Sequence, residues 1–193
     1  MYWFDKYDII LGSGSPRRKA LMEEAGFKFT VMVPDADESF PEDMPVAEVA
    51  VFLAKQKSAV FLSHPIPQNR IIITADSIVV LENQILGKPK SVNEAKTMLS
   101  MIAGQQHHVI TGVCLLSQNS SHTFSCQTMV EVNSMTAEEI DYYIKWFEPF
   151  DKAGSYGIQE WLGLCKINSI EGSYTNVMGL PMERLYHELL TMI

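Results

Sequence analysis

Apolar residues in the first half of the chain alternate between short strand-like runs and stretches with helical spacing. Three short runs predict strands, at residues 9–11, 27–33 and 71–76. Two stretches predict helices, from Pro16 to about Gly26 and over residues 46–62. The acidic segment 34–45 predicts a loop, and Asp76 is expected at the carboxyl end of the third strand.

The second half of the chain predicts strands that pair with their sequence neighbours. Residues 78–87 are expected to form a continuation strand, a tight turn and a short return strand. Two long β segments predict an antiparallel hairpin, at residues 107–116 and 122–132, and another strand is expected over 164–170. Helices are expected after two capping boxes and after a proline, namely Ser91 with Glu94, Thr136 with Glu139, and Pro181. This order predicts an α/β fold with a mixed sheet rather than a purely parallel one.

Composition limits the kinds of partner. With 193 residues, 47% of them hydrophobic and 20% charged, the chain is expected to form one domain or two intimately packed lobes. A net charge of -8 argues against broad attraction to nucleic acid or to an anionic membrane. No apolar run approaches the roughly 20 residues of a membrane helix, and the acidic amino terminus is unlike a signal peptide. We therefore expect a cytoplasmic protein whose three cysteines, Cys114, Cys126 and Cys165, are reduced core residues.

The segment GSGSPRRKA at residues 12–20 is suited to binding a phosphate group. It follows the first predicted strand and leads into a helix, with Ser15 as the N-cap and Pro16 at the first helical position. The free amides of that first turn would then lie beside the guanidinium groups of Arg17 and Arg18. Neither a P-loop nor a dinucleotide fingerprint fits this segment. Alone, it could equally be a turn and a capped helix with solvated arginines.

Five segments carry more polar groups than a scaffold needs: SGSPRR at 13–18, DADES at 35–39, TADS at 74–77, GKP at 87–89 and DKAGSYGIQ at 151–159. With the AK pair at 54–55, TGV at 111–113 and NVMGLP at 176–181, they follow in order the pattern SxSPRR, DxDE, AK, ADT, GKP and AGxYGIQ. In these segments the chain resembles the Maf family of nucleoside triphosphate pyrophosphatases. Each motif is weak alone, but the ordered set covers essentially the whole chain.

The resemblance implies a fold of the inosine triphosphatase type, with an elongated mixed sheet, flanking helices and two lobes around a cleft. It also implies metal-dependent hydrolysis of a nucleoside triphosphate to a monophosphate and pyrophosphate, by a possible homodimer. At Arg17 and Gln159 the chain resembles the subgroup of the family that acts on dTTP and UTP. It departs from the pattern of that subgroup at Ser77, where the usual residue is Thr. The alternatives are a pyrophosphatase for 7-methyl-GTP or other modified nucleotides, and a nucleotide-sensing regulator of septum formation without significant turnover.

Each candidate residue has an expected role. The resemblance assigns Asp76 as the proton acceptor, and Glu38 is a second catalytic carboxylate; both suit Mg²⁺ or Mn²⁺, which prefer oxygen ligands. The expected substrate-binding residues are Ser13, Arg17, Arg18, Lys55 and Lys88, and the specificity residues are Arg17, Ser77 and Gln159. Lys57 is expected to be a solvated surface residue. Asp151 and Lys152 could contact metal or phosphate, or could simply lie on the surface.

Overall fold

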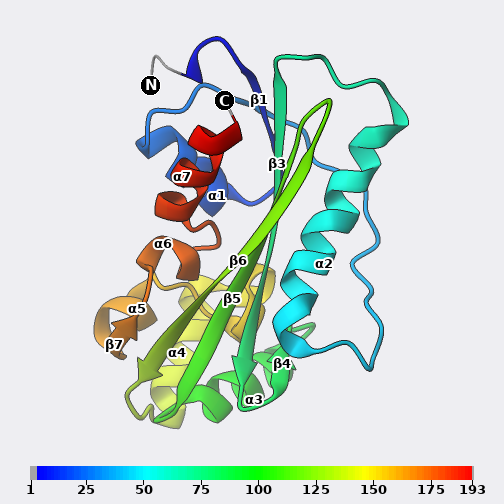
Figure 1. Ribbon diagram of the computed structural model, residues 1–193. Coiled ribbons are helices and arrows are strands. Elements are labelled where there is room, and N and C mark those ends of the chain that lie inside the picture. The colour runs from blue at the N-terminus through cyan, green and yellow to red at the C-terminus, as the bar shows by residue number, and fades with distance from the viewer. Residues whose placement is uncertain (1–3, 193) are drawn as a thin grey trace. The chain divides into compact units, whose positions relative to one another are not determined.

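The computed structural model describes residues 4–192, which form a seven-stranded mixed sheet flanked by helices (Figure 1). The strand order is β2-β1-β3-β5-β6-β7, and β4 pairs with β3 alone. Strand β1 is parallel to β2 and β3, whereas β4 is antiparallel to β3 and β7 is antiparallel to β6. The strands are β1 (Asp8–Gly12), β2 (Thr30–Val31), β3 (Arg70–Leu81), β4 (Gln84–Leu86), β5 (Gln106–Leu116), β6 (Ser121–Val132) and β7 (Ile167–Glu171). The prediction of a mixed α/β fold is therefore confirmed.

Among the described residues the structure has seven α-helices, and each helix that the sequence predicts from a capping or proline signal begins at that signal. They are α1 (Pro16–Glu24), α2 (Val46–Ala59), α3 (Val92–Ile102), α4 (Ala137–Phe147), α5 (Trp161–Cys165), α6 (Tyr174–Val177) and α7 (Met182–Met192), with short 3₁₀ turns η2 (Val60–Ser63), η3 (Pro149–Asp151) and η4 (Ala153–Ser155). The Ser15 hydroxyl accepts from the Arg18 amide at 3.4 Å, as an N-cap should. Thr136 and Glu139 form a complete capping box at the start of α4.

The chain divides into two compact units, each described separately. Among the described residues, unit 1 comprises residues 4–76, 111–126 and 179–192, and unit 2 comprises residues 77–110 and 127–178. Strands β3, β5 and β6 each contribute residues to both units. The expectation of a single domain built from two packed lobes stays a prediction.

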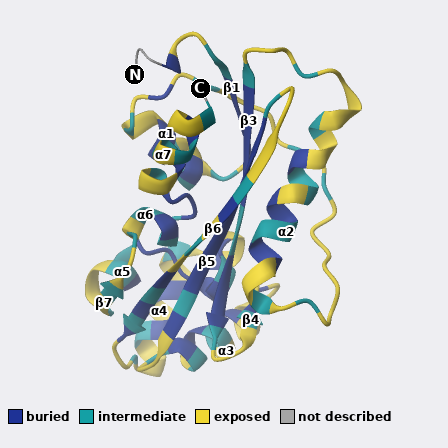
Figure 2. Ribbon diagram, viewed as in Figure 1, coloured by how far each residue is buried: buried dark blue, intermediate teal, exposed yellow. Residues whose placement is uncertain are grey.

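In unit 1, α2 covers one face of the sheet, and α1 and α7 lie on the other (Figure 1). Close approach of α2 requires glycine on β5, because a Cβ at Gly112 would lie 2.3 Å from the backbone of Ala50. On β3, the Thr74 hydroxyl donates to the Ala54 carbonyl of α2 at 2.7 Å. Most of β5 is buried (Figure 2). The helix is therefore held in a defined position on β3 and β5.

In unit 2, helices α3 and α4 supply much of a hydrophobic core. Leu99 and Ile102 of α3 and Tyr143 of α4 are fully buried there. The loop after α4 also contributes, through Tyr156 and Ile158. This loop carries Gln159, so its backbone is anchored in the core of the unit.

Several sequence predictions are wrong in detail. Strand β2 covers only residues 30–31, and its two residues are exposed. Strand β3 continues without a break from Arg70 to Leu81, so Asp76 lies inside a strand and not at its carboxyl end. Residues 164–165 are helical because they belong to α5, and the strand begins only at Ile167. Among the cysteines only Cys114 is buried, whereas Cys126 is half-buried and Cys165 is exposed.

Candidate active site

Unit 1 brings two of the predicted carboxylates together on one lysine. The Lys57 Nζ atom lies 2.8 Å from Glu38 Oε1 and is also paired with Asp76 Oδ1. The Lys57 and Asp76 side chains are only 12% and 16% exposed, whereas Glu38 is 53% exposed. Three charged groups thus meet at a half-buried point, and the single ammonium charge offsets one of the two carboxylate charges.

The position of this cluster follows from the docking of α2 on β3. Thr74 and Asp76 are two residues apart on a strand, so their side chains project from the same face, towards α2. Lys57 is three residues after Ala54, the residue that accepts the Thr74 hydrogen bond, and so lies on the same side of α2. The expectation that Lys57 is a solvated surface residue is therefore wrong. Lys55 lies elsewhere on the helix and is exposed.

Glu38 comes from the acidic loop, whose neighbouring residues are fixed by local hydrogen bonds. The Asp37 carboxylate accepts from the Ser39 amide at 2.9 Å and from the Ser39 hydroxyl at 2.6 Å. These bonds lower the pKa of Asp37. With its amide nitrogen facing the loop, Gln56 of α2 donates to the carbonyls of Asp37 (3.0 Å) and Ser39 (3.2 Å). Helix α2 thus holds the backbone on both sides of Glu38.

Arg18 is a buried structural link rather than a solvated cation, with only 8% of its surface exposed. Its Nε atom donates to the Gly179 carbonyl at 2.7 Å, and its Nη1 atom donates to the Ala75 carbonyl (2.8 Å) and the Ser13 hydroxyl (3.1 Å). Burial lowers the pKa of Arg18, although the nearby charges of Asp76 and Glu38 favour its charged form. The guanidinium therefore ties the start of α1 to the residue that precedes Asp76.

The amino terminus of α1 lies beside this link. Ser13 is buried, and its hydroxyl also accepts from the Ser15 amide at 3.3 Å. Arg17 is half-buried on the first turn of the helix, where the backbone amides and the helix dipole favour an anion. Unit 1 thus combines a helix start whose amides favour an anion, Arg17, the Lys57 ammonium and two carboxylates.

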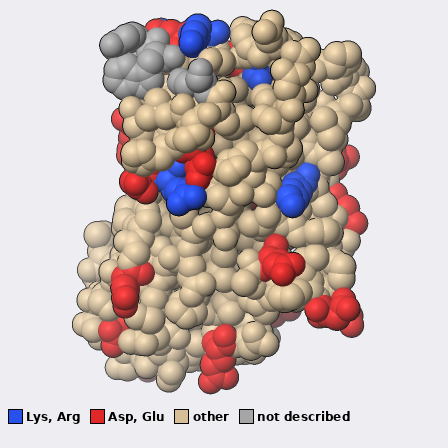
Figure 3. All heavy atoms as spheres, in the orientation of Figure 1, with Lys and Arg blue, Asp and Glu red and all other residues tan. Residues whose placement is uncertain are grey.

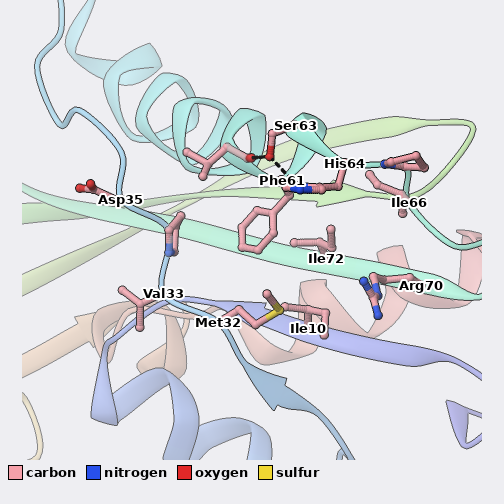
Figure 4. Close-up of a pocket in the computed structure, with 13 residues that line it drawn as sticks. Ile10, Met32, Val33, Asp35, Phe61, Ser63, His64, Ile66, Arg70 and Ile72 are labelled. Atoms are coloured by element: carbon pink, nitrogen blue, oxygen red, sulfur yellow. Dashed lines mark hydrogen bonds between the residues drawn. The ribbon is translucent and has the colours of Figure 1, made fainter.

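A separate pocket of about 330 Å³ also lies in unit 1. Its lining is mainly apolar, with Ile10, Ile72, Met32 and Phe61 around it (Figure 4). Asp35 of the acidic loop lies at this pocket and not in the Lys57 cluster. Of the loop carboxylates, only Glu38 is paired with Lys57 among the described residues.

Unit 2 carries the remaining predicted residues. Ser77 directly follows Asp76, and Lys88 is exposed just after β4. The Gly154 amide donates to the Gly87 carbonyl at 3.1 Å, which joins the GKP segment to the loop that contains Gln159. The Oε1 atom of Gln159 is buried and has no hydrogen-bond partner among the described residues. Asp151 is 56% exposed and paired with Lys152, which is itself buried.

The fold matches that of a known structure. The Staphylococcus aureus Ham1 protein superposes with a TM-score of 0.52 at 14% sequence identity, covering 94% of this chain and 99% of that one. This likeness confirms the predicted fold class, an α/β fold of the inosine triphosphatase type. The family model of the Maf-like proteins matches residues 8–192, so the chain belongs to the Maf-like family.

Curated relatives resemble the chain along nearly its whole length. Proteins named dTTP/UTP pyrophosphatase are 46% identical over 188 residues in Phocaeicola vulgatus and 43% identical over 187 residues in Flavobacterium psychrophilum. The matches cover 96% of this chain and 96% of the first relative, and 97% and 95% for the second. Among the described residues, no helix has both the length and the apolar character needed to cross a membrane.

Proposed function

We propose that this protein hydrolyses nucleoside triphosphates, preferentially dTTP and UTP, to the nucleoside monophosphate and pyrophosphate. The observation that carries the proposal is the pairing of Asp76 and Glu38 with one Lys57 ammonium in a half-buried cluster. The names of curated relatives that match the chain from end to end agree with it. Those names do not favour a nucleotide sensor without turnover.

In the proposed reaction, Asp76 is the proton acceptor. Its Oδ1 atom is paired with Lys57, and Oδ2 is proposed to accept a proton from the attacking water. The water oxygen forms a bond to the α-phosphorus, and the bond from that phosphorus to the bridging oxygen breaks, releasing pyrophosphate. Lys57 holds the carboxylate in place and, with Arg17, Lys88 and the start of α1, is proposed to balance the charge of the phosphates.

Glu38 and Asp76 also fit a divalent cation, because they bring hard oxygen donors to one point around Lys57. The described residues contain no cluster of three or more His, Cys, Asp or Glu side chains suited to a metal. Two carboxylates are nevertheless enough, because proteins usually bind Mg²⁺ through one or two carboxylates together with the phosphates of the substrate. When bound, Mg²⁺ or Mn²⁺ would neutralise phosphate charge and favour the hydroxide form of a bound water.

Base selection is proposed to depend on Gln159, with Arg17 and Ser77. An amide bears both a donor and an acceptor, which suits the O2, N3–H and O4 edge of thymine or uracil. The buried Gln159 Oε1 atom, which has no partner among the described residues, supports this role. Burying an acceptor without a partner is costly, so a donor on the ligand would stabilise it.

The remaining partners follow from charge and from the proposed activity. We propose a cytoplasmic protein that binds nucleotides and not nucleic acid, with a homodimer as its expected assembly. The net charge of -8 argues against binding nucleic acid, as does the scattered distribution of Lys and Arg side chains on the face in Figure 3. That face of the described residues shows no broad basic surface.

The proposal is tested by incubating the purified protein with each nucleoside triphosphate and Mg²⁺ or Mn²⁺. The products must be separated so that monophosphate is distinguished from diphosphate and pyrophosphate from phosphate. Release of pyrophosphate from dTTP and UTP, with dCTP and 7-methyl-GTP hydrolysed more slowly, is the expected result. Nucleotide binding without turnover under either metal would contradict the proposal and favour a sensor.

A further inference from the structure

The Tyr143 hydroxyl joins helix α4 to both sides of Gln159. Tyr143 is fully buried in unit 2. Its oxygen accepts from the Gly157 amide at 2.9 Å and donates to the Glu160 Oε2 atom. Burial and the neighbouring Glu160 carboxylate raise the pKa of Tyr143, so the hydroxyl keeps its proton for this bond. One oxygen on a rigid helix therefore fixes the backbone two residues before Gln159 and the side chain one residue after it.

Lys152 completes the network from the other end of the loop. Its side chain is 8% exposed, and Nζ lies 3.1 Å from Glu160 Oε1 and 2.7 Å from Asp151 Oδ1. Glu160 thus uses one carboxylate oxygen for Tyr143 and the other for Lys152. A buried charge is costly unless it is paired, so the buried Lys152 ammonium should keep its contact with Glu160. This ion pair joins the two ends of the loop. The possibility that Lys152 lies on the surface is wrong.

The backbone inside this loop needs such support. Gly154 and Ser155 both have positive φ angles, +69° and +63°, and Ser155 is fully buried. A left-handed conformation at a residue other than glycine is strained and persists only when its surroundings hold it. A Cβ at Gly157 would lie 2.8 Å from Glu160 Cδ and 3.0 Å from Gln159 Nε2. The Gln159 amide and the Glu160 carboxylate are therefore packed directly against the Gly157 backbone.

We propose that Tyr143 and Glu160 are positioning residues that hold the Gln159 amide in the orientation needed to select the base. This inference rests on the proposed function. Neither residue contacts the substrate in this proposal; both act through the 157–160 backbone. The expected consequence is that base selectivity depends on the Tyr143 hydroxyl. This group lies on helix α4, outside the loop that carries Gln159.

The test compares Tyr143→Phe with Tyr142→Phe. The first variant keeps the ring stacked on Phe147, at 5.1 Å between centroids, and removes only the oxygen. Tyr142 is the adjacent tyrosine, is 45% exposed and packs on Trp161, so its variant is a matched control. For each protein, kcat and KM are measured for dTTP and dCTP, whose bases differ at the edge that an amide reads. The hydrogen exchange rate of the Gly157 amide is measured in parallel.

In Tyr143→Phe we expect the preference for dTTP over dCTP in kcat/KM to fall roughly tenfold, mainly through a higher KM for dTTP. The Gly157 amide should exchange faster, because its acceptor is gone. Glu160→Gln, which keeps an acceptor for Tyr143, should retain more selectivity than Glu160→Ala. Tyr142→Phe should match the wild type in every measurement.

Two results would overturn the inference. One is an unchanged ratio of kcat/KM values in Tyr143→Phe, even if its melting temperature is lower, because the tyrosine would then serve stability alone. The other is unchanged exchange of the Gly157 amide. If the wild type hydrolyses no nucleotide, the proposed function fails. The positioning role is then decided by two other comparisons of Tyr143→Phe with the wild type: the exchange rate of the Gly157 amide, and the ratio of the dissociation constants for dTTP and dCTP. Should Tyr143→Phe not fold, the two Glu160 variants give the same comparison.

Discussion

The Lys57 ammonium is paired with the Asp76 carboxylate across the interface between α2 and β3. The two residues are 19 positions apart in the chain, and the Thr74–Ala54 hydrogen bond sets their register. Because the same ammonium is also paired with Glu38, a substitution of Lys57 removes the partner of both carboxylates. The predictions on catalysis follow from this shared cation.

Asp76→Asn should abolish most of the pyrophosphatase activity without unfolding the protein. The amide has nearly the same shape but cannot serve as a base, and general base catalysis contributes about 10²- to 10⁴-fold. We expect kcat to fall by at least about 100-fold, measured as pyrophosphate release from dTTP. Asp35→Asn is the control, because Asp35 belongs to the acidic loop that carries Glu38 but lines the separate pocket. Equal losses in both variants would contradict the assignment.

Lys57→Met should impair both activity and stability, whereas Lys55→Met should impair neither. Removing the ammonium leaves Asp76 and Glu38 without their shared partner, which should destabilise the fold by about 1–3 kcal/mol. Lys55 lies two residues earlier on the same helix and is exposed. Urea unfolding and dTTP hydrolysis measure the two effects. A large loss of activity in Lys55→Met would support the sequence prediction that Lys55 binds phosphate.

The contrast between these two lysines shows how far the sequence alone could reach. Apolar spacing identified the helix and capping signals identified its neighbours, because both are local properties of the chain. Which lysine lies near Asp76 depends on how α2 docks on β3, a long-range contact that residue spacing does not encode. The burial of Lys152 was missed for the same reason, since its partner Glu160 lies eight positions away beyond a strained turn.

Asp76 illustrates the same limit for a strand. The β-branched run 71–76 predicts a strand, which the structure confirms, but the polar pair Asp76–Ser77 resembles a strand end. In the structure β3 continues through this pair; β1 pairs with β3 up to Thr74, and β4 pairs with β3 from Val79 onward. A strand that changes partners along its length does not need a turn at its polar residues.

Arg18→Lys should destabilise the protein while Arg17→Lys should not. Arg18 satisfies three acceptors on Gly179, Ser13 and Ala75, and a lysine ammonium cannot reproduce that planar geometry. Leaving buried acceptors without their donor should lower the free energy of unfolding by about 3 kcal/mol, measured in urea. Arg17→Lys is expected to raise the KM for dTTP with little change in stability. Equal stability of the two variants would show that the buried link is dispensable.

Acid should destabilise the protein through His107, which is 1% exposed and lies 2.7 Å from the Tyr156 hydroxyl through its Nε2 atom. Burial lowers the pKa of His107 from 6.5 to about 4. Between these values the unfolded chain binds more protons than the folded one, so stability rises with pH and is lost as pH falls through this window. From pH 7 to pH 5 the free energy of unfolding should decrease by about 2 kcal/mol on account of this residue.

His107→Gln tests this linkage, because an amide can still bond the Tyr156 hydroxyl but does not titrate. Urea unfolding at pH 7 and pH 5 should show a smaller pH-dependent loss in His107→Gln than in the wild type, even though the variant is less stable at pH 7. His187→Gln is the matched control, since the His187 side chain is 64% exposed. It should retain the full pH dependence. If His107→Gln loses as much stability on acidification as the wild type, other groups dominate the acid response and the buried histidine is not its source.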